Sequence, residues 1–142
     1  MSDVVVDSSV VAKWVLPEPD SLRAQQIMLD VAAAGGRLVV LDLAFAEVGN
    51  VIWKRHRQRL ITLAEAESFL SALQRCPVHV ESAIRVLNAA LQIAIRFDRA
   101  VYDALFVALL HDLKIPGVTA DEPLFNAVSS KFSQLRLLRD WV

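Results

Sequence analysis

Four acidic residues stand where carboxylates from separate parts of the chain could meet and do chemistry together. Asp7 directly follows a run of three valines, and Asp121 follows a second short strand-like run. Glu47 and Asp103 lie inside segments whose apolar residues recur at helical spacing. Because hard divalent cations such as Mg²⁺ and Mn²⁺ prefer carboxylate oxygens, these four residues together predict a metal site.

Asp103 lies in the sequence VYDALFVALL, whose apolar character predicts a buried carboxylate. An unpaired buried carboxylate is costly, so Asp103 needs a proton, a basic partner such as Arg99, or a metal ion. We favour the metal, and the ion pair with Arg99 remains the alternative. For Asp7 and Asp121 the alternative is that each merely caps the helix that follows it.

Glu47 belongs to a polar stripe on its helix. Glu47, Asn50, Lys54 and Arg57 follow a three-four-three spacing, and the opposite face is apolar. Such a stripe is either solvated surface or a functional face. The cations at its end either complement the helix dipole or contact an anionic partner.

The remaining pattern predicts the elements that position these residues. We expect strands at about 3–7, 38–41, 78–80, 118–120 and 135–138, and helices at about 9–16, 44–57, 82–97 and 101–113, with one before Gly35, one capped by Thr62 and Glu65, and a short one after Asp121. This alternation indicates an α/β fold, a single domain over residues 1–142 with a mostly parallel central β-sheet flanked by α-helices. If the first strand and the 118–120 strand are parallel neighbours, Asp7 and Asp121 emerge at the carboxyl edge, where such sheets bind ligands.

Composition limits the classes of function. The chain has 142 residues and 55% are apolar, yet charges interrupt every apolar stretch before the roughly 18 residues that a membrane span requires. With no basic leader and a single cysteine, Cys76, we expect a protein of the cytoplasm. A net charge of −1 argues against general affinity for polyanions, so nucleic acid would need a local basic patch.

The segments VVVDSSVVAKW, FAEVGNVIWK, VYDALFVALL and VTADEPLF, in this order and spacing, resemble the four acidic motifs of PIN-domain ribonucleases, specifically the VapC toxins of prokaryotic toxin-antitoxin pairs. The resemblance covers nearly the whole chain. It implies a PIN-like fold and an endoribonuclease that depends on Mg²⁺ or Mn²⁺. By motif it also implies that Asp7, Glu47, Asp103 and Asp121 are both the catalytic and the metal-binding residues.

The resemblance extends to substrate and partners. Ser9 matches the small polar residue two positions after the first Asp, and Thr119 the hydroxyl two before the last. With Lys54 and Arg57, which could contact RNA phosphates, they form the expected nucleic-acid-binding set. The family implies an RNA substrate, a cognate antitoxin and a homodimer. One departure is that Arg99-Ala100 stands before the third motif, where Ser or Thr is common.

Two other classes remain as alternatives. The chain could be a PIN-like module that binds RNA or protein without cleaving it, although four retained carboxylates argue against this because they would repel phosphate. A DNA-directed nuclease of similar fold is disfavoured by the short chain, which lacks the extra length used to clamp a duplex.

Overall fold

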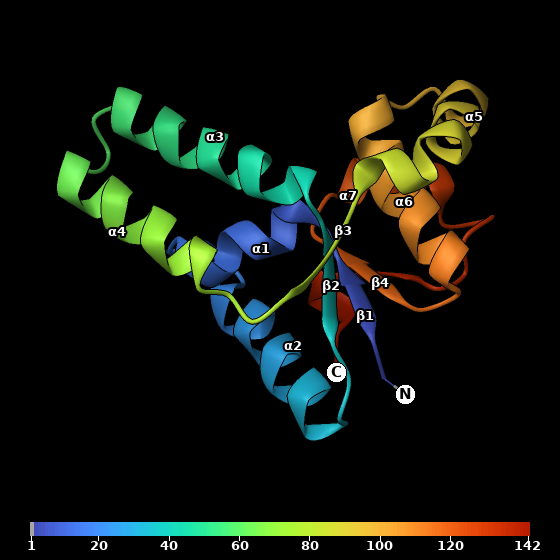
Figure 1. Ribbon diagram of the computed structural model, residues 1–142, viewed down its shortest axis with the longest axis horizontal. Helices are drawn as coiled ribbons and strands as arrows, with labels where there is room; N and C mark the ends of the chain where they lie inside the picture. Colours follow the sequence, from blue (N-terminus) through green and yellow to red (C-terminus); the bar gives the residue numbers. More distant parts are fainter. Residues whose placement is uncertain (1) are drawn as a thin grey trace.

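The computed structural model describes residues 2–142, which form a five-stranded sheet with helices on both faces (Figure 1). The strands are β1 (Val4–Val6), β2 (Leu38–Leu41), β3 (His79–Glu81), β4 (Gly117–Thr119) and β5 (Leu135–Leu137). The α-helices are α1 (Ser8–Val15), α2 (Ser21–Ala33), α3 (Leu43–Arg57), α4 (Leu63–Gln74), α5 (Leu87–Phe97), α6 (Val101–Leu113) and α7 (Glu122–Val128). Two 3₁₀ helices, η1 (Ala83–Val86) and η2 (Leu138–Asp140), complete the described elements.

The strands run parallel in the order β3-β2-β1-β4-β5. Strand β1 lies in the centre, where Val6 pairs with Val118 of β4. The carboxyl ends of β1 and β4 are therefore neighbours, as the sequence predicts. The α/β fold with a parallel sheet is confirmed, and strands that follow one another along the chain are connected through helices, as a parallel arrangement requires.

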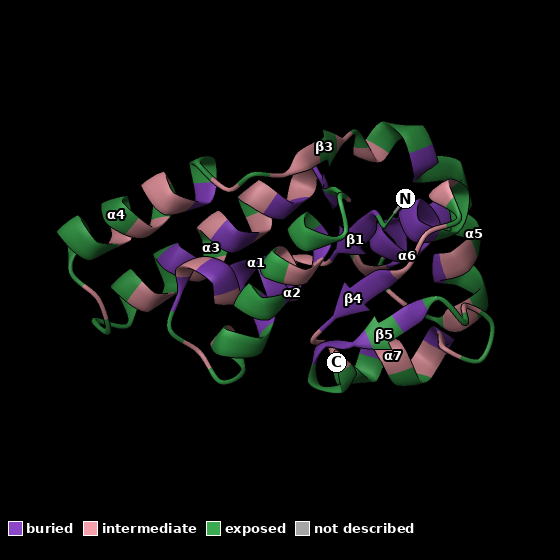
Figure 2. Cartoon of the chain, turned by 90° about the horizontal axis from the view of Figure 1, so that it is seen from below, coloured by how far each residue is buried: buried purple, intermediate pink, exposed green. Residues whose placement is uncertain are grey.

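Each face of the sheet has its own apolar core. Successive residues of a strand point to opposite faces, so Val4 and Val6 pack with α1 to α4 while Val5 packs with α5 to α7. Helix α6 is the most enclosed helix, since all seven residues from Ala104 to Leu110 are buried (Figure 2). Its first turn, by contrast, opens toward the edge of the sheet where β1 and β4 end.

Helices α3 and α4 form an antiparallel hairpin that extends away from the sheet (Figure 1). Helix α3 buries Ala44, Val48 and Ile52, the apolar face expected from its spacing. Helix α4 begins with the predicted capping box, in which the Glu65 amide donates to Thr62 Oγ1 at 3.1 Å and the Thr62 amide to Glu65 Oε1 at 2.9 Å.

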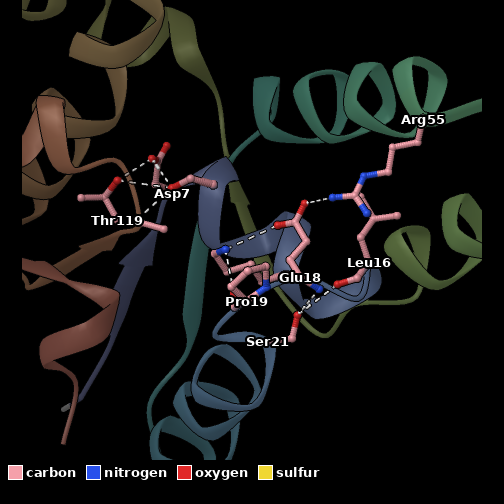
Figure 3. A network of polar contacts seen from close by, with 10 residues as sticks. Asp7, Leu16, Glu18, Pro19, Ser21, Arg55 and Thr119 are labelled. Carbon is pink, nitrogen blue, oxygen red and sulfur yellow. Dashed lines mark hydrogen bonds and ion pairs between the residues drawn. The ribbon is translucent and has the colours of Figure 1, made fainter. Parts of the chain in front are cut away.

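A half-buried carboxylate, Glu18, fixes α3 to α1 (Figure 3). Glu18 forms an ion pair with Arg55 of α3 and lies 3.5 Å from Lys13 Nζ of α1. Lys13 also donates a hydrogen bond of 2.9 Å to the carbonyl oxygen of Pro19. This network sets the position of the helix that carries Glu47.

One expected helix is interrupted. The sequence predicts a single helix over 82–97, but the structure has η1 followed by α5, and Val86, the last residue of η1, leaves the helical conformation at φ −118° and ψ 14°. The Val86 side chain is buried in the core beneath α6, so packing overrides the regular helical pattern. Among residues 2–142, no helix combines the length and apolar character needed to cross a membrane.

Two glycines give a matched test of this packing. A Cβ on Gly36 would lie 2.1 Å from the Ser2 carbonyl oxygen, whereas a Cβ on Gly49, inside α3, would meet nothing within 4 Å. Gly36→Ala should therefore lower the free energy of unfolding by about 1–3 kcal/mol, and Gly49→Ala should raise it by up to about 1 kcal/mol. Urea unfolding of both variants checks this, and equal effects would contradict the close approach of Gly36 to the backbone of Ser2.

Candidate active site at the carboxyl edge of the sheet

Asp7 lies at the end of β1 and is held by hydrogen bonds on both carboxylate oxygens. Its Oδ1 accepts from the Ser8 amide at 2.9 Å, which caps α1. Its Oδ2 accepts from Ser9 Oγ at 2.8 Å and from Thr119 Oγ1 at 2.7 Å (Figure 3). The capping role is real, but the second oxygen is bound by hydroxyl groups of two different elements, which a simple helix cap does not require.

The two hydroxyl groups also fix the turn after β4. Ser9 Oγ accepts from the Ala120 amide at 2.9 Å, and Thr119 Oγ1 accepts from the Asp121 amide at 3.0 Å. Thr119 is completely buried. The expectation that Thr119 contacts RNA is therefore wrong: its hydroxyl positions Asp7 and the β4–α7 turn from inside the protein.

Glu47 reaches the same region from the first half of α3 and is half-buried. Burial raises the pKa of its carboxyl above the ordinary value, and the negative charges of Asp7 and Asp103 raise it further. A hydrogen bond from Ser8 partly offsets this rise in pKa. The pKa of Asp7 is also raised, mainly by burial and in smaller part by Asp103, against the lowering effect of its hydrogen bonds.

Asp103 is less buried than its sequence predicts. It lies in the first turn of α6, its side chain is 33% exposed, and its Oδ2 is 3.4 Å from Nη2 of Arg99. The expectation that Asp103 is buried is thus wrong, because α6 becomes enclosed only from Ala104 onward. The ion pair that stood as the alternative is present.

Asp121 is at the carboxyl end of β4, but its side chain serves another purpose. Its Oδ1 accepts from the Leu124 amide at 3.0 Å and caps α7. It also lines a hollow of about 350 Å³ together with Lys13, Asp20 and Arg139. The structure therefore couples Asp7, Glu47 and Asp103 electrostatically and leaves the fourth carboxylate directed at a helix terminus.

These donors suit a hard divalent cation, because they are oxygen ligands whose mutual repulsion a cation would relieve. Within residues 2–142, however, no three acidic, imidazole or thiol side chains already converge as a metal-holding group. The residue types fit Mg²⁺ or Mn²⁺, and the side chains must adjust for all of them to share an ion.

The basic residues in the last turn of α3, among them Lys54, Arg55 and Arg57, have two different environments. Arg55 is committed to Glu18, as Figure 3 shows, and so is structural. Lys54 and Arg57 are exposed, and the guanidinium of Arg57 lies 5.3 Å from the ring centroid of Trp53. Trp53 is itself 51% exposed, although tryptophan in so apolar a sequence is more often buried. Its exposure and the commitment of Arg55 were not visible from spacing.

A family model and an individual relative each match most of this chain. A family model described as the PIN domain matches residues 4–130. Ribonuclease VapC3 of Pyrobaculum aerophilum is 33% identical over 123 residues, covering 85% of this chain and 91% of the relative.

Solved structures share the fold. PAE2754 from P. aerophilum superimposes with a TM-score of 0.74 at 19% identity, covering 97% of this chain and 92% of its own. VapC20 of Mycobacterium tuberculosis, a sarcin-ricin loop cleaving toxin, has a TM-score of 0.67 at 15% identity and coverages of 94% and 98%. VapBC2 from Rickettsia felis, solved bound to a DNA fragment from the VapBC2 promoter, has a TM-score of 0.62 at 12% identity and coverages of 95% and 96%.

The repulsion at this edge predicts a stabilising substitution. Since the pKa of Glu47 is raised in the folded protein, the metal-free fold loses stability as pH rises above about 4.5, the ordinary glutamate pKa, and through the raised value. Glu47→Gln should therefore raise the free energy of unfolding in EDTA at pH 7.5 by about 0.5 kcal/mol, and the gain should vanish near pH 4.5.

Urea titrations at the two pH values measure this difference, with Glu67→Gln on the exposed surface of α4 as the control that should show no gain. A Glu47→Gln variant that is less stable at pH 7.5 would mean that the carboxylate stabilises the metal-free fold.

Proposed function

Because this chain belongs to the PIN-domain family, we propose that it is an endoribonuclease toxin of VapC type that hydrolyses RNA phosphodiester bonds with the help of Mg²⁺ or Mn²⁺. We assign this activity to the single domain of residues 1–142. The observation that carries the proposal is the gathering of Asp7, Glu47 and Asp103, where burial and, in smaller part, neighbouring negative charges raise the pKa of Asp7 and of Glu47.

The alternative, a PIN-like module that binds RNA or protein without cleavage, accounts poorly for this arrangement. Half-buried carboxylates that repel one another destabilise the fold and repel phosphate, so a surface that only binds RNA has no use for them. A hydrolase has such a use, because a cation held there offsets much of the local negative charge and lets a phosphate approach.

In the proposed site Asp7, Glu47, Asp103 and Asp121 hold the cation. When bound, Mg²⁺ or Mn²⁺ supplies Lewis-acid activation of water and neutralises charge on the scissile phosphate. Asp7 is held in a fixed orientation by Ser9 and Thr119. Asp121 keeps its Oδ1 on the α7 cap and offers its other oxygen.

Substrate RNA crosses the edge of the sheet toward α3 in this proposal. Lys54 and Arg57 are exposed on the helix that carries Glu47 and contact phosphates, while half-buried Ser9 lies beside Asp7. Arg55 takes no part, because Glu18 holds it. Apart from these four carboxylates the chain is mildly basic, which is consistent with this path.

We further propose an antitoxin partner, a homodimer and a cytoplasmic location. The VapBC2 complex, which shares the fold, supports an antitoxin. The exposed apolar residues Ile84, Leu87, Leu91 and Ile95, which follow one another at helical spacing along η1 and α5, offer a surface for a second copy.

Metal dependence is the first test of the proposal. The purified protein should cleave RNA with Mg²⁺ or Mn²⁺, lose cleavage in EDTA and regain it when Mn²⁺ is added in excess. Asp7→Asn should lower the cleavage rate by more than about a hundredfold, since loss of a residue that merely supports a ligand costs about 10- to 100-fold.

Asn is also a good helix N-cap, so the variant should remain folded, which a thermal melt checks. Cleavage that continues in EDTA, or that survives Asp7→Asn in a folded protein, would refute the metal mechanism.

The proposed RNA path is tested by removing two charges. Lys54→Ala with Arg57→Ala should weaken binding of single-stranded RNA in EDTA and reduce the slope of log K against log salt by about 1.4, at about 0.7 for each phosphate contact. Fluorescence anisotropy over a salt series measures that slope.

The matched control removes one arginine and one lysine elsewhere, Arg75→Ala with Lys131→Ala. Both are exposed and lie in the segments that lead into β3 and β5, four residues before each strand begins, so they lie toward the opposite, amino edge of the sheet. Equal slopes for the two double variants would mean that Lys54 and Arg57 do not contact RNA and only complement the α3 dipole.

A further inference from the structure

Arg99 occupies the tight turn between α5 and α6. Asp98 ends α5 in the left-handed region at φ 54°, the Arg99 amide donates to the Ala94 carbonyl oxygen at 3.1 Å, and α6 begins two residues later. The Arg99 side chain is 26% exposed and pairs with Asp103 across the turn. The backbone of the turn therefore holds the guanidinium against one particular carboxylate of the site.

This pairing is incomplete. The distance from Arg99 Nη2 to Asp103 Oδ2 is 3.4 Å, longer than the 2.7–2.9 Å typical of charge-assisted hydrogen bonds. Within residues 2–142, Arg99 Nε is the buried side-chain polar atom that lacks a hydrogen-bond partner. A guanidinium that fitted Asp103 as a permanent structural partner would use its fork in full. Here charge attraction holds Arg99, and close hydrogen-bond geometry contributes little.

The position of Arg99 is not explained by its helix. It precedes the N-terminus of α6, where the helix dipole disfavours a positive charge, and Ala100 at the N-cap provides no side-chain hydrogen bond. What favours a cation here is the negative charge of Asp103, with which Arg99 forms its ion pair. Arg99 thus partly neutralises the charge of Asp103.

We propose that Arg99 is a built-in counter-cation of the acidic site: it pairs with Asp103 while no metal is bound, and a divalent cation displaces it from that carboxylate. The inference rests on the proposed function in one respect, that the site binds Mg²⁺ or Mn²⁺. Asp103 thus has both of the partners considered from the sequence: Arg99 in the metal-free protein and the metal ion when it is bound. Arg99 is a positioning residue that lowers the metal affinity of the site.

Competition between two cations for one carboxylate predicts a gain of affinity when the resident cation is removed. Arg99→Gln should bind Mn²⁺ about tenfold more tightly than the wild type, because a unit charge beside the ligand opposes binding even where solvent screens it. The measurement is isothermal titration with Mn²⁺ alone, which needs neither RNA nor cleavage.

Arg96→Gln is the matched control. Arg96 is exposed in the last turn of α5 and stacks on Phe97 at 5.1 Å, so its removal takes the same charge from the same region without freeing Asp103. Its Mn²⁺ affinity should stay within about twofold of the wild type, since an exposed charge is screened.

The outcomes separate this inference from the proposed function. If the wild type binds Mn²⁺ with the same affinity as Arg99→Gln, or more tightly, the counter-cation role of Arg99 is overturned. The proposed metal-dependent nuclease activity is then unaffected. Failure of both proteins to bind Mn²⁺ overturns the metal-dependent function and the inference together. Binding by Arg99→Gln that greatly exceeds wild type, with Arg96→Gln unchanged, supports both.

A second measurement on the wild type covers the case in which Arg99→Gln does not fold. The Nε–H resonance of Arg99, assigned by its loss in Arg99→Lys, should shift when Mg²⁺ saturates the protein, and that of Arg96 should not. An Arg99 resonance that stays in place at saturation means that the guanidinium is not displaced, which overturns the inference.

Discussion

The site depends on the two hydrogen bonds that Oδ2 of Asp7 accepts from the hydroxyl groups of Ser9 and Thr119. Through them a single carboxylate joins the end of β1, the start of α1 and the end of β4. The same hydroxyl groups accept hydrogen bonds from the backbone of the β4–α7 turn. The orientation of Asp7 and the course of the chain through Asp121 are therefore fixed together, and this is possible only because β1 and β4 are parallel neighbours.

Around these hydrogen bonds the protein holds the negative charges of Asp7, Glu47 and Asp103 near one another, which destabilises the metal-free fold. Burial and mutual repulsion raise the pKa of Asp7 and of Glu47, and the fold tolerates this because apolar cores on both faces of the sheet stabilise it. Sites of function are where such local conflict is expected.

Two arginines near the site show how differently a cation can be used. Arg55 meets Glu18, which is half-buried and also lies near Lys13, so this ion pair joins α3 to α1 and supports the helix on which Glu47 lies. Arg99 meets Asp103 at a longer distance and with Nε unpartnered. The first arrangement is rigid support for the site, while the second belongs to the site and is open to exchange.

The sequence by itself determined the α/β fold, most element boundaries and the meeting of Asp7 with β4, because strand runs, helical spacing and capping residues are local signals. It could not determine which side chains are covered, since burial depends on elements distant along the chain. The sequence pattern predicts RNA contact for Thr119, which is buried, and a core position for Asp103, which lies at the margin of the core. The interruption at Val86 and the pairing of Arg55 with Glu18 have the same origin, because each is a contact between segments that only the folded chain brings together.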